Sequence, residues 1–522
     1  MRTELIRPIG ELVRHQAESR GDSPAYENAR RAVTYAQLAD RTGNLAGHLQ
    51  DLGLHPEQSV ALMLPNSVDW IEACFGVARA GGVAVPISYE ATRDEVAYRL
   101  ADARCAIAVT TDEQAGLLSR LLREQGRAGV LVLADRAGDR YPEGHRLEDL
   151  LARPARSAPR DPAALDAPRF IVYTSGTTGR AKGVKLTERS MLWVTAACWA
   201  PIAGLGAHDR VLSPLPLFHS YALNLCVLGI LATGASEYIL ERFSVRDALV
   251  LIEGGRFTLM PGVPTMFHYL LDACRAAGRP MGRPVSGKLR LCLSAGAIMP
   301  GPLNEEFEAH FGAKLLDGYG ITETSTMVTL NWPSSTRVMG SCGLPLPGLA
   351  VRLLDPATGK DAAPGAEGEL VVRGPNLMLG YHDKPAETAA ALREGWYHTG
   401  DLARSDPNGF LTITGRLKEL IIRGGQNIAP AEVEQVVTAY APVLDCAVVG
   451  IAHEHLGEVP IAVVVARAGQ TIDPPALVAH CAQHLSAYKV PVAVHVVGEI
   501  FRTGSGKIMR YRLRELLQQS SA

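Results

Sequence analysis

The sequence has no excess of charge of either sign and no cysteine motif. Its 522 residues include 52 lysines and arginines against 54 aspartates and glutamates. A formal net charge of −2 gives no electrostatic reason to expect a nucleic acid or an anionic membrane as partner. The nine cysteines contain no C-x-x-C pair, which argues against a zinc site and against a disulfide framework. We therefore expect reduced, mostly buried thiols.

Long apolar runs are missing as well. The first residues, MRTELIRPIGELVRHQ, hold no continuous apolar segment, so we expect no signal peptide. The most apolar stretch, residues 225–232, is shorter than the about 20 residues that a membrane-spanning helix needs. We expect a cytoplasmic protein without a membrane span.

Strand-like and helix-like segments alternate through the first four-fifths of the chain. A helix is expected over residues 34–54, where Thr34 and Gln37 are placed as a capping box. The alternation predicts an α/β fold with largely parallel, helix-covered sheets and ligands at the loops that follow the strands. The expected strands cover residues 60–64, 83–87, 106–110 and 130–133, and the helices between them 68–80 and 93–103.

Two stretches divide the chain. Residues 153–168 hold four prolines and have the composition of a connector. A second boundary follows Gly415, after which a helix introduced by Pro430 and further strands form a small α/β domain.

The segment YTSGTTGRAKG at residues 173–183 leads from an apolar strand into a Ser/Thr/Gly loop. Glycines let backbone N–H groups converge on an anion, hydroxyls add donors, and Lys182 adds charge. The loop is not a Walker A motif, because Gly-Lys-[Ser/Thr] does not occur at the required spacing. It indicates a phosphate-binding loop of another kind.

Further motifs supply the other groups that nucleotide chemistry needs. GYGITET places Tyr319 where it can stack on a base and Glu323 where it can hold Mg²⁺. YHTGD and GRLKE bring the Asp401 carboxylate and the Arg416 guanidinium onto loops, and GSGK places Lys507 on a glycine loop.

Together, YTSGTTGRAKGV, GYGITET, YHTGD, GRLKELI, GGQNI and GSGKI resemble the motifs of the adenylate-forming superfamily, in the same order and over nearly the whole chain. This superfamily comprises acyl-CoA synthetases, peptide-synthetase adenylation domains and luciferases. The resemblance implies a large N-terminal domain at residues 1–415, a hinge at 416–418 and a small mobile C-terminal α/β domain at 419–522. It also implies activation of a carboxylic acid by ATP to an acyl-adenylate, with release of pyrophosphate.

The resemblance assigns roles to individual residues. Lys507 corresponds to the catalytic lysine that bridges the substrate carboxylate and the α-phosphate, where a cation stabilises the attack of one anion on another. Glu323 and Thr174 are the implied Mg²⁺ contacts, and Asp401 and Arg416 the implied ribose contacts. The implied ATP site comprises Thr174, Ser175, Gly176, Thr177, Thr178, Gly179, Lys182, Gly296, Ala297, Gly318, Tyr319, Gly320, Thr322, Asp401 and Arg416.

The resemblance also implies a second conformation. In the family, the C-terminal domain rotates after adenylation at the position of Lys418, which withdraws the catalytic lysine and opens a pantetheine tunnel. The tunnel would pass the turn at Gly424 and Gly425, where glycines suit the close passage of a thiol arm.

The segment PLFHSY indicates which branch of the superfamily the chain resembles. Peptide-synthetase domains typically place an aspartate here to pair with an α-amino group, whereas this chain has His219 and no carboxylate. A bound amino acid would bury an unpaired ammonium group, which is costly. His219 instead matches the aromatic-gate histidine of acyl- and aryl-CoA ligases, and with Val263 and Gly318 it is expected to line the acyl pocket.

We therefore expect an acyl-CoA synthetase that uses ATP, Mg²⁺ and coenzyme A on an apolar aliphatic or aryl acid. The alternative is a standalone ligase that stops at acyl-AMP or loads an acyl carrier protein. Ligases of the superfamily that load carrier proteins usually have an insertion before the hinge, and no such insertion occurs between Gly343 and Gly415. A third hypothesis is a catalytically inactive, nucleotide-binding regulator with the same fold. The presence of the catalytic and ribose-binding residues argues against it. The acid itself cannot be read from the sequence.

Overall fold

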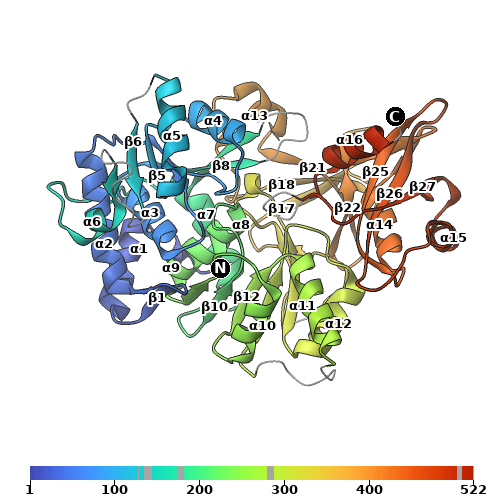
Figure 1. Cartoon of the computed structure of the whole chain (residues 1–522), viewed down its shortest axis with the longest axis horizontal. Helices are drawn as coiled ribbons and strands as arrows, with labels where there is room; N and C mark the ends of the chain where they lie inside the picture. The colour runs from blue at the N-terminus through green and yellow to red at the C-terminus, as the bar shows by residue number, and fades with distance from the viewer. Residues whose placement is uncertain are drawn as a thin grey trace.

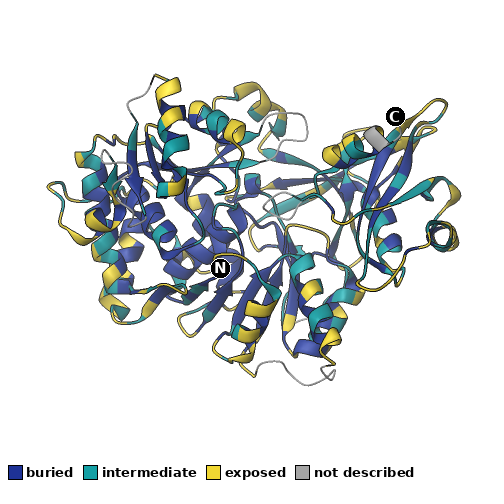
Figure 2. Ribbon diagram, in the orientation of Figure 1, coloured by how far each residue is buried: buried dark blue, intermediate teal, exposed yellow. Residues whose placement is uncertain are grey.

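The computed structural model describes residues 1–126, 129–134, 144–174, 181–278, 287–334, 336–502 and 508–520. Within these residues the strands form four sheets. Two helix-covered sheets make up the larger part of the molecule, and the fourth sheet lies with the C-terminal helices at the other end (Figure 1). Most residues in the interiors of the strands are buried, whereas the outer faces of the helices are exposed (Figure 2).

The first sheet has the strand order β16-β15-β14-β13-β12-β10-β11-β1-β2. Its central strands are parallel, from β1 through β11, β10, β12 and β13 to β14, and its edges are antiparallel. The parallel strands therefore deliver the loops that follow them to one edge of the sheet. The strands are β1 (Pro24–Glu27), β2 (Ala32–Thr34), β10 (Arg210–Ser213), β11 (Ser236–Ile239), β12 (Leu259–Gly262), β13 (Leu291–Ser294), β14 (Lys314–Tyr319), β15 (Thr329–Leu330) and β16 (Leu344–Pro345).

The second sheet has the order β19-β9-β8-β4-β3-β5-β6-β7, again parallel except at β9 and β19. Strands β4 and β5 are buried along their whole length, as expected of parallel strands covered on both faces. The strands are β3 (Ser59–Met63), β4 (Val83–Pro86), β5 (Ile107–Thr110), β6 (Val130–Leu133), β7 (His145–Arg146), β8 (Pro168–Thr174), β9 (Lys182–Thr187) and β19 (Gly380–Tyr381).

The helices of this larger part include a buried group that continues through π-helical turns. The turn at Leu223–Gly229 is buried at every residue and leads into α9, which explains the most apolar run of the sequence. The helices are α1 (Ile9–Arg20), α2 (Tyr35–Asp51), α3 (Val68–Arg79), α4 (Arg93–Asp102), α5 (Asp112–Glu124), α6 (Leu147–Ala152), α7 (Glu188–Val194), α8 (Ser220–Ala222), α9 (Ile230–Thr233), α10 (Val245–Glu253), α11 (Pro264–Ala276), α12 (Gly301–Phe311) and α13 (Pro385–Ala391).

The third and fourth sheets are mainly antiparallel. The third sheet ends at Arg416 and the fourth begins at Ile421, with a single 3₁₀ turn between them. The fourth sheet and its helices bury a core of their own, centred on Val433, Val448 and Val464. The elements are β17 (Ala350–Leu354), β18 (Gly368–Arg373), β20 (Leu392–Arg393), β21 (Trp396–Ser405), β22 (Leu411–Arg416), β23 (Ile421–Arg423), β24 (Gln426–Ile428), β25 (Val443–His453), β26 (Gly457–Ala466), β27 (Ala493–Val496), α14 (Pro430–Thr438), α15 (Pro474–His484) and α16 (Arg510–Ser520).

The structure confirms the α/β fold and the elements expected from the sequence, with ends that differ by at most three residues. The capping box is present, because Thr34 N–H donates to Gln37 Oε1 at 3.0 Å and Gln37 N–H donates to Thr34 Oγ1 at 3.3 Å. All nine cysteines are free thiols and buried. Across the described ranges, no helix is both long and apolar enough to cross a membrane.

Candidate active site

Three of the expected site residues follow neighbouring parallel strands at one edge of the first sheet. Gly262, Ser294 and Asp317 are aligned neighbours at the ends of β12, β13 and β14. Val263, Gly296 and Tyr319 follow these three positions within two residues, so the parallel register brings them to the same edge. This is where open α/β sheets bind ligands.

Asp401 is the centre of a network that joins three motifs. It pairs across the third sheet with Arg416, whose Nε lies 2.7 Å from Asp401 Oδ1, and it accepts a hydrogen bond from the hydroxyl of Tyr319 on Oδ2. The Asp401 side chain is only 3% exposed, and its charge raises the pKa of Arg416. Burial, together with the neighbouring Asp401, raises the pKa of Tyr319 well above its ordinary value, so the Tyr319 hydroxyl stays protonated and donates.

Glu323 and Lys182 are brought together by Tyr381. The Tyr381 hydroxyl donates to Glu323 Oε1 at 3.0 Å, and Lys182 Nζ lies 4.7 Å from the centroid of the Tyr381 ring. Thr174 is the register partner of Lys182 on β8 and β9, at the end of the strand that enters the phosphate-loop motif. Of the Mg²⁺ contacts expected from the sequence, Thr174 thus lies at the end of β8, and Glu323 lies in the 3₁₀ turn Thr322–Thr324 after β14, where Tyr381 of β19 contacts it.

Glycine is required at two positions of GYGITET. A Cβ atom on Gly320 would lie 1.4 Å from the carbonyl oxygen of Thr326, and one on Gly318 would lie 2.5 Å from Cε of Met327. The backbone of this segment therefore packs more closely than any side chain allows. It fixes Tyr319 and Glu323 relative to the sheet.

His219 caps the short helix α8, with Nδ1 accepting the N–H of Tyr221 at 3.3 Å. This contact fixes the orientation of the His219 ring at the start of α8. The next residue, Ser220, lies 3.1 Å from the hydroxyl of Thr322 and accepts from Thr326 through its carbonyl oxygen. His219 and Thr322 are thus on adjoining segments of the same site.

Val263 and Gly296 are neighbours, although the sequence predicts Val263 in the acyl pocket and Gly296 in the ATP site. A Cβ on Gly296 would stand 3.7 Å from Val263 Cγ1, and Gly296 has the left-handed φ of +89°. Gly296 and Ala297 are both exposed. The two expected sites therefore share a border.

The residues expected to serve the second conformation lie near the start of the fourth sheet. Lys418 is exposed in the 3₁₀ turn Leu417–Glu419. Gly424 and Gly425 form the turn between β23 and β24 with φ of +56° and +80°, a conformation that favours glycine. Ser175, Gly176, Thr177, Thr178 and Gly179 of the phosphate loop, and Lys507, lie outside the described residues.

Supporting residues that the sequence analysis missed hold these loops in place. Asn376 is fully buried and donates to the carbonyl oxygens of Thr324 and Met327 at 3.1 and 2.8 Å. Glu369 accepts from the N–H of Gly400 at 3.1 Å and lies 3.0 Å from His398. Neither residue belongs to a motif, so only the contacts reveal them, and the same is true of Tyr381.

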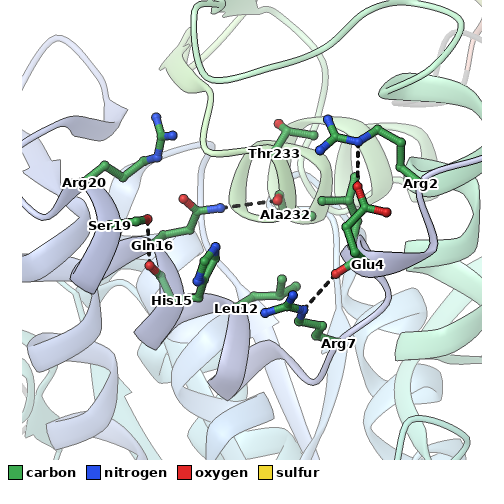
Figure 3. Close-up of a pocket in the computed structure, with 11 residues that line it drawn as sticks. Arg2, Glu4, Arg7, Leu12, His15, Gln16, Ser19, Arg20, Ala232 and Thr233 are labelled. Carbon is green, nitrogen blue, oxygen red and sulfur yellow. Dashed lines mark hydrogen bonds and ion pairs between the residues drawn. The ribbon is translucent and has the colours of Figure 1, made fainter.

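A pocket of about 250 Å³ lies elsewhere, between the first residues of the chain, α1 and the end of α9 (Figure 3). Two of the arginines that line it bind Glu4. Arg2 Nε donates to the Glu4 carboxylate and Arg7 Nε to the Glu4 carbonyl oxygen, both at 2.8 Å. None of the motif residues lines this pocket.

Comparison with known proteins agrees with the geometry. The profile of the AMP-binding enzymes matches residues 13–382, and that of the AMP-binding enzyme C-terminal domain matches residues 432–507. The first match covers more than half of the chain, which therefore belongs to the family of AMP-binding enzymes, and with it to the adenylate-forming superfamily.

Curated relatives and solved structures extend over nearly the full length. A feruloyl-CoA synthase of Amycolatopsis sp is 36% identical over 485 residues, covering 92% of this chain and 94% of that protein. A long-chain-fatty-acid–CoA ligase of Yersinia pestis is 34% identical over 536 residues, covering 97% of this chain and 93% of that protein. ATP-bound MatB from Rhodopseudomonas palustris is 30% identical with a TM-score of 0.88, covering 98% of this chain and 100% of that one, whereas the apo form of MatB gives 0.76 at the same identity and coverage.

Proposed function

We propose that this protein is an acyl-CoA synthetase, which activates a carboxylic acid as acyl-AMP and then transfers the acyl group to coenzyme A. The observation that carries the proposal is the network of Tyr319, Asp401 and Arg416, which joins three nucleotide motifs at the ligand edge of the first sheet. The two curated relatives named above are a CoA synthase and a CoA ligase, which supports coenzyme A as the acceptor rather than a carrier protein.

Asp401 and Arg416 hold the ribose in this proposal. A buried carboxylate whose position is fixed by two donors is suited to accept hydrogen bonds from both ribose hydroxyls, and such charge-assisted bonds are stronger than neutral ones. Tyr319 stacks on the adenine, beside Gly296 and Ala297. Lys182, with the hydroxyl- and glycine-rich loop at residues 175–179, neutralises the phosphates.

Thr174 and Glu323 fit a Mg²⁺ site. In enzymes that act on nucleotides, Mg²⁺ is commonly bound by one or two carboxylates together with substrate phosphates and water. Glu323 supplies one carboxylate, which the Tyr381 hydroxyl holds through Oε1, and Thr174 adds a hydroxyl. The bound ion would offset the charge of the departing pyrophosphate.

Lys507 performs the central electrostatic task of the first step. The carboxylate of the acid attacks the α-phosphorus of ATP, the bond from that phosphorus to the bridging oxygen breaks, and pyrophosphate leaves with its electron pair. Both reactants are anionic, so a cation placed between them stabilises the transition state. In the second step the thiol of coenzyme A attacks the acyl carbon and AMP leaves. The proposed domains are residues 1–415 and 419–522, with the hinge at 416–418.

The acid is proposed to be apolar, aliphatic or aryl, in a cytoplasmic enzyme. His219, Val263 and Gly318 line its pocket at the shared border with the adenine site. His219 offers no negative charge to an α-ammonium group, so proteinogenic amino acids should be poor substrates.

Pyrophosphate release over a panel of carboxylic acids, with and without coenzyme A, tests the proposal. We expect release that depends on an apolar acid, and a thioester product only when coenzyme A is present. Release without thioester formation would favour an enzyme that stops at acyl-AMP or loads a carrier protein. Absence of acid-dependent release with every acid would contradict the proposed chemistry, and equal turnover of an amino acid and its desamino analogue would contradict the assignment of the pocket.

A further inference from the structure

An ion pair connects helix α11 of the larger part to the fourth sheet. Arg467 follows β26, and its Nη1 lies 2.8 Å from Asp272 Oδ2 on α11. The arginine is fixed on its own side, because its Nε donates to the carbonyl oxygen of Ala441 at 3.0 Å and its backbone N–H donates to that of Pro442 at 2.9 Å. Both side chains are about one-quarter exposed, at 25% and 24%. The contact is therefore a defined link between the two units.

The carboxylate of Asp272 is prepared for this role on α11. Arg275 Nη1 donates to its Oδ1 at 2.8 Å, and His268 Nε2 lies 3.2 Å from its Oδ2. Partial burial alone would raise the pKa of Asp272, but His268, Arg467 and Arg275 together lower it to about 2. The carboxylate is thus ionised across the physiological range and oriented from within its own helix.

The same face of α11 also lies near the stem of the segment that carries Lys507. Arg502 and Ile508, which flank residues 503–507, are paired in a β-bridge. Arg502 donates to both carboxylate oxygens of Asp445, at 2.8 and 3.0 Å. Tyr269 is close enough to this pair for its charges to act on the hydroxyl, since burial and Asp445 raise the pKa of Tyr269 while Arg502 lowers it.

From this arrangement we infer that Asp272 and Arg467 are positioning residues for the adenylation half-reaction. By holding the fourth sheet against α11, the pair keeps the stem at Arg502 and Ile508 facing the larger part, where the proposed role of Lys507 requires it. The chain also superposes more fully on the ATP-bound form of MatB than on its apo form, with TM-scores of 0.88 and 0.76. The inference rests on the function proposed above.

The experiment measures the two half-reactions separately in charge variants of the pair. Pyrophosphate exchange reports adenylation, and conversion of synthetic acyl-AMP to the thioester reports the second step. A partly exposed ion pair contributes little, so Arg467→Ala should lower the exchange rate only about two- to fivefold. Arg467→Glu should lower it further, because it faces Asp272 with a like charge, and Asp272→Lys combined with Arg467→Glu should restore much of the loss. Thioester formation from acyl-AMP should be unaffected in all three.

Arg352→Ala is the control. It removes an arginine from an ion pair of similar length, 2.7 Å to Asp361, that involves neither Asp272 nor Arg467, so exchange should remain at the level of the unmodified enzyme. Domain arrangement is read by energy transfer between dyes at Glu305→Cys and Gln470→Cys, both exposed positions, and the burial of all nine native cysteines favours selective labelling. Arg467→Glu should change the transfer efficiency and Arg352→Ala should not.

The outcomes separate the inference from the proposed function. If Arg467→Glu slows both half-reactions equally, slows neither, or is not rescued by Asp272→Lys, the positioning role is wrong. If Lys507→Ala retains normal pyrophosphate exchange, the catalytic assignment of Lys507 is wrong, whatever the Arg467 variants do. Thermal unfolding of each variant shows that the comparison is made on folded protein.

Discussion

The nucleotide side of the site and the C-terminal unit are built in different ways. Asp401 is buried, pairs with Arg416 and accepts from Tyr319, while Glu323 accepts from Tyr381. In contrast, Lys418 is exposed, and a Cβ on Gly425 would meet nothing within 4 Å. On the nucleotide side, these contacts hold the side chains in position before any ligand binds, which lowers the free-energy cost of reorganisation during the reaction. The other side is connected by a short turn and by polar contacts such as the Asp272–Arg467 pair, as suits a part that is proposed to change position between the two steps.

The largest effect that would test this contrast is expected at Lys507. Lys507→Ala should reduce adenylation by on the order of 10²–10³, the usual cost of losing one transition-state contact. Conversion of supplied acyl-AMP to the thioester should persist, because the carboxylate and phosphate are by then joined covalently. Pyrophosphate exchange and thioester formation measure the two steps. Equal loss of both in a folded variant would show that the two steps do not use different arrangements.

On the nucleotide side, Asp401→Ala should raise the KM for ATP. Hydrogen bonds to a charged group contribute about 1.5–3 kcal/mol, so we expect a change of about 10- to 100-fold. The unmodified enzyme should also discriminate against 2′-deoxy-ATP, and the variant should lose that preference. Asp361→Ala is the control, since Asp361 pairs with Arg352 on the exposed surface of the same sheet. If 2′-deoxy-ATP serves as well as ATP, the ribose assignment is wrong.

On the C-terminal side, Lys418→Pro should impair the second step more than the first. Proline fixes φ and would restrict the turn between β22 and β23 about which the C-terminal unit is proposed to rotate. Lys418→Ala is the control, because it removes the exposed side chain without restricting the backbone. A several-fold slower thioester formation with near-normal pyrophosphate exchange is expected for Lys418→Pro alone. The same slowing in Lys418→Ala would point to the side chain instead of the hinge.

The smallest expected effect is on thermal stability and concerns a carboxylic acid with little exposure, of which each region has one. Glu434, in the C-terminal unit, is paired with Arg510. Glu237, on β11 in the larger part, has both carboxylate oxygens buried, and burial raises its pKa well above the ordinary value, which the side chain of Ser213 offsets only in part. Glu237 is therefore neutral in the folded protein at pH values where the unfolded chain ionises it.

The sign of the resulting pH dependence follows from linkage. The contribution of Glu237 to stability is complete below the unfolded pKa of about 4.3 and is lost as the pH rises toward the folded pKa. Glu237→Gln removes this loss, so the variant should melt about one or two degrees higher at pH 8 than the unmodified protein, since 1 kcal/mol shifts Tm by only a few degrees in a large domain. The gain should disappear near pH 4. A gain that grows toward low pH would show that Glu237 is ionised in the folded state.

Much of the fold could be predicted from local pattern. The capping box at Thr34 and the strand–helix alternation depend on the spacing of neighbouring residues, and both are confirmed. The sequence pattern does not separate the antiparallel third sheet from the rest, because register shifts between β18 and β21 and between β21 and β22 interrupt the regular alternation along its strands.

The sequence by itself determined the family, the order of the motifs and which residue types could meet a nucleotide, because motif glycines and charged residues stand at fixed spacings. Only the tertiary structure decided that Asp401 is held by both Tyr319 and Arg416, that Tyr381 joins Glu323 to Lys182, and that Asp272 meets Arg467. These partners are separated by 15 to 199 positions in the chain. Contacts of that kind depend on strand register and on how the sheets pack, which no local spacing encodes.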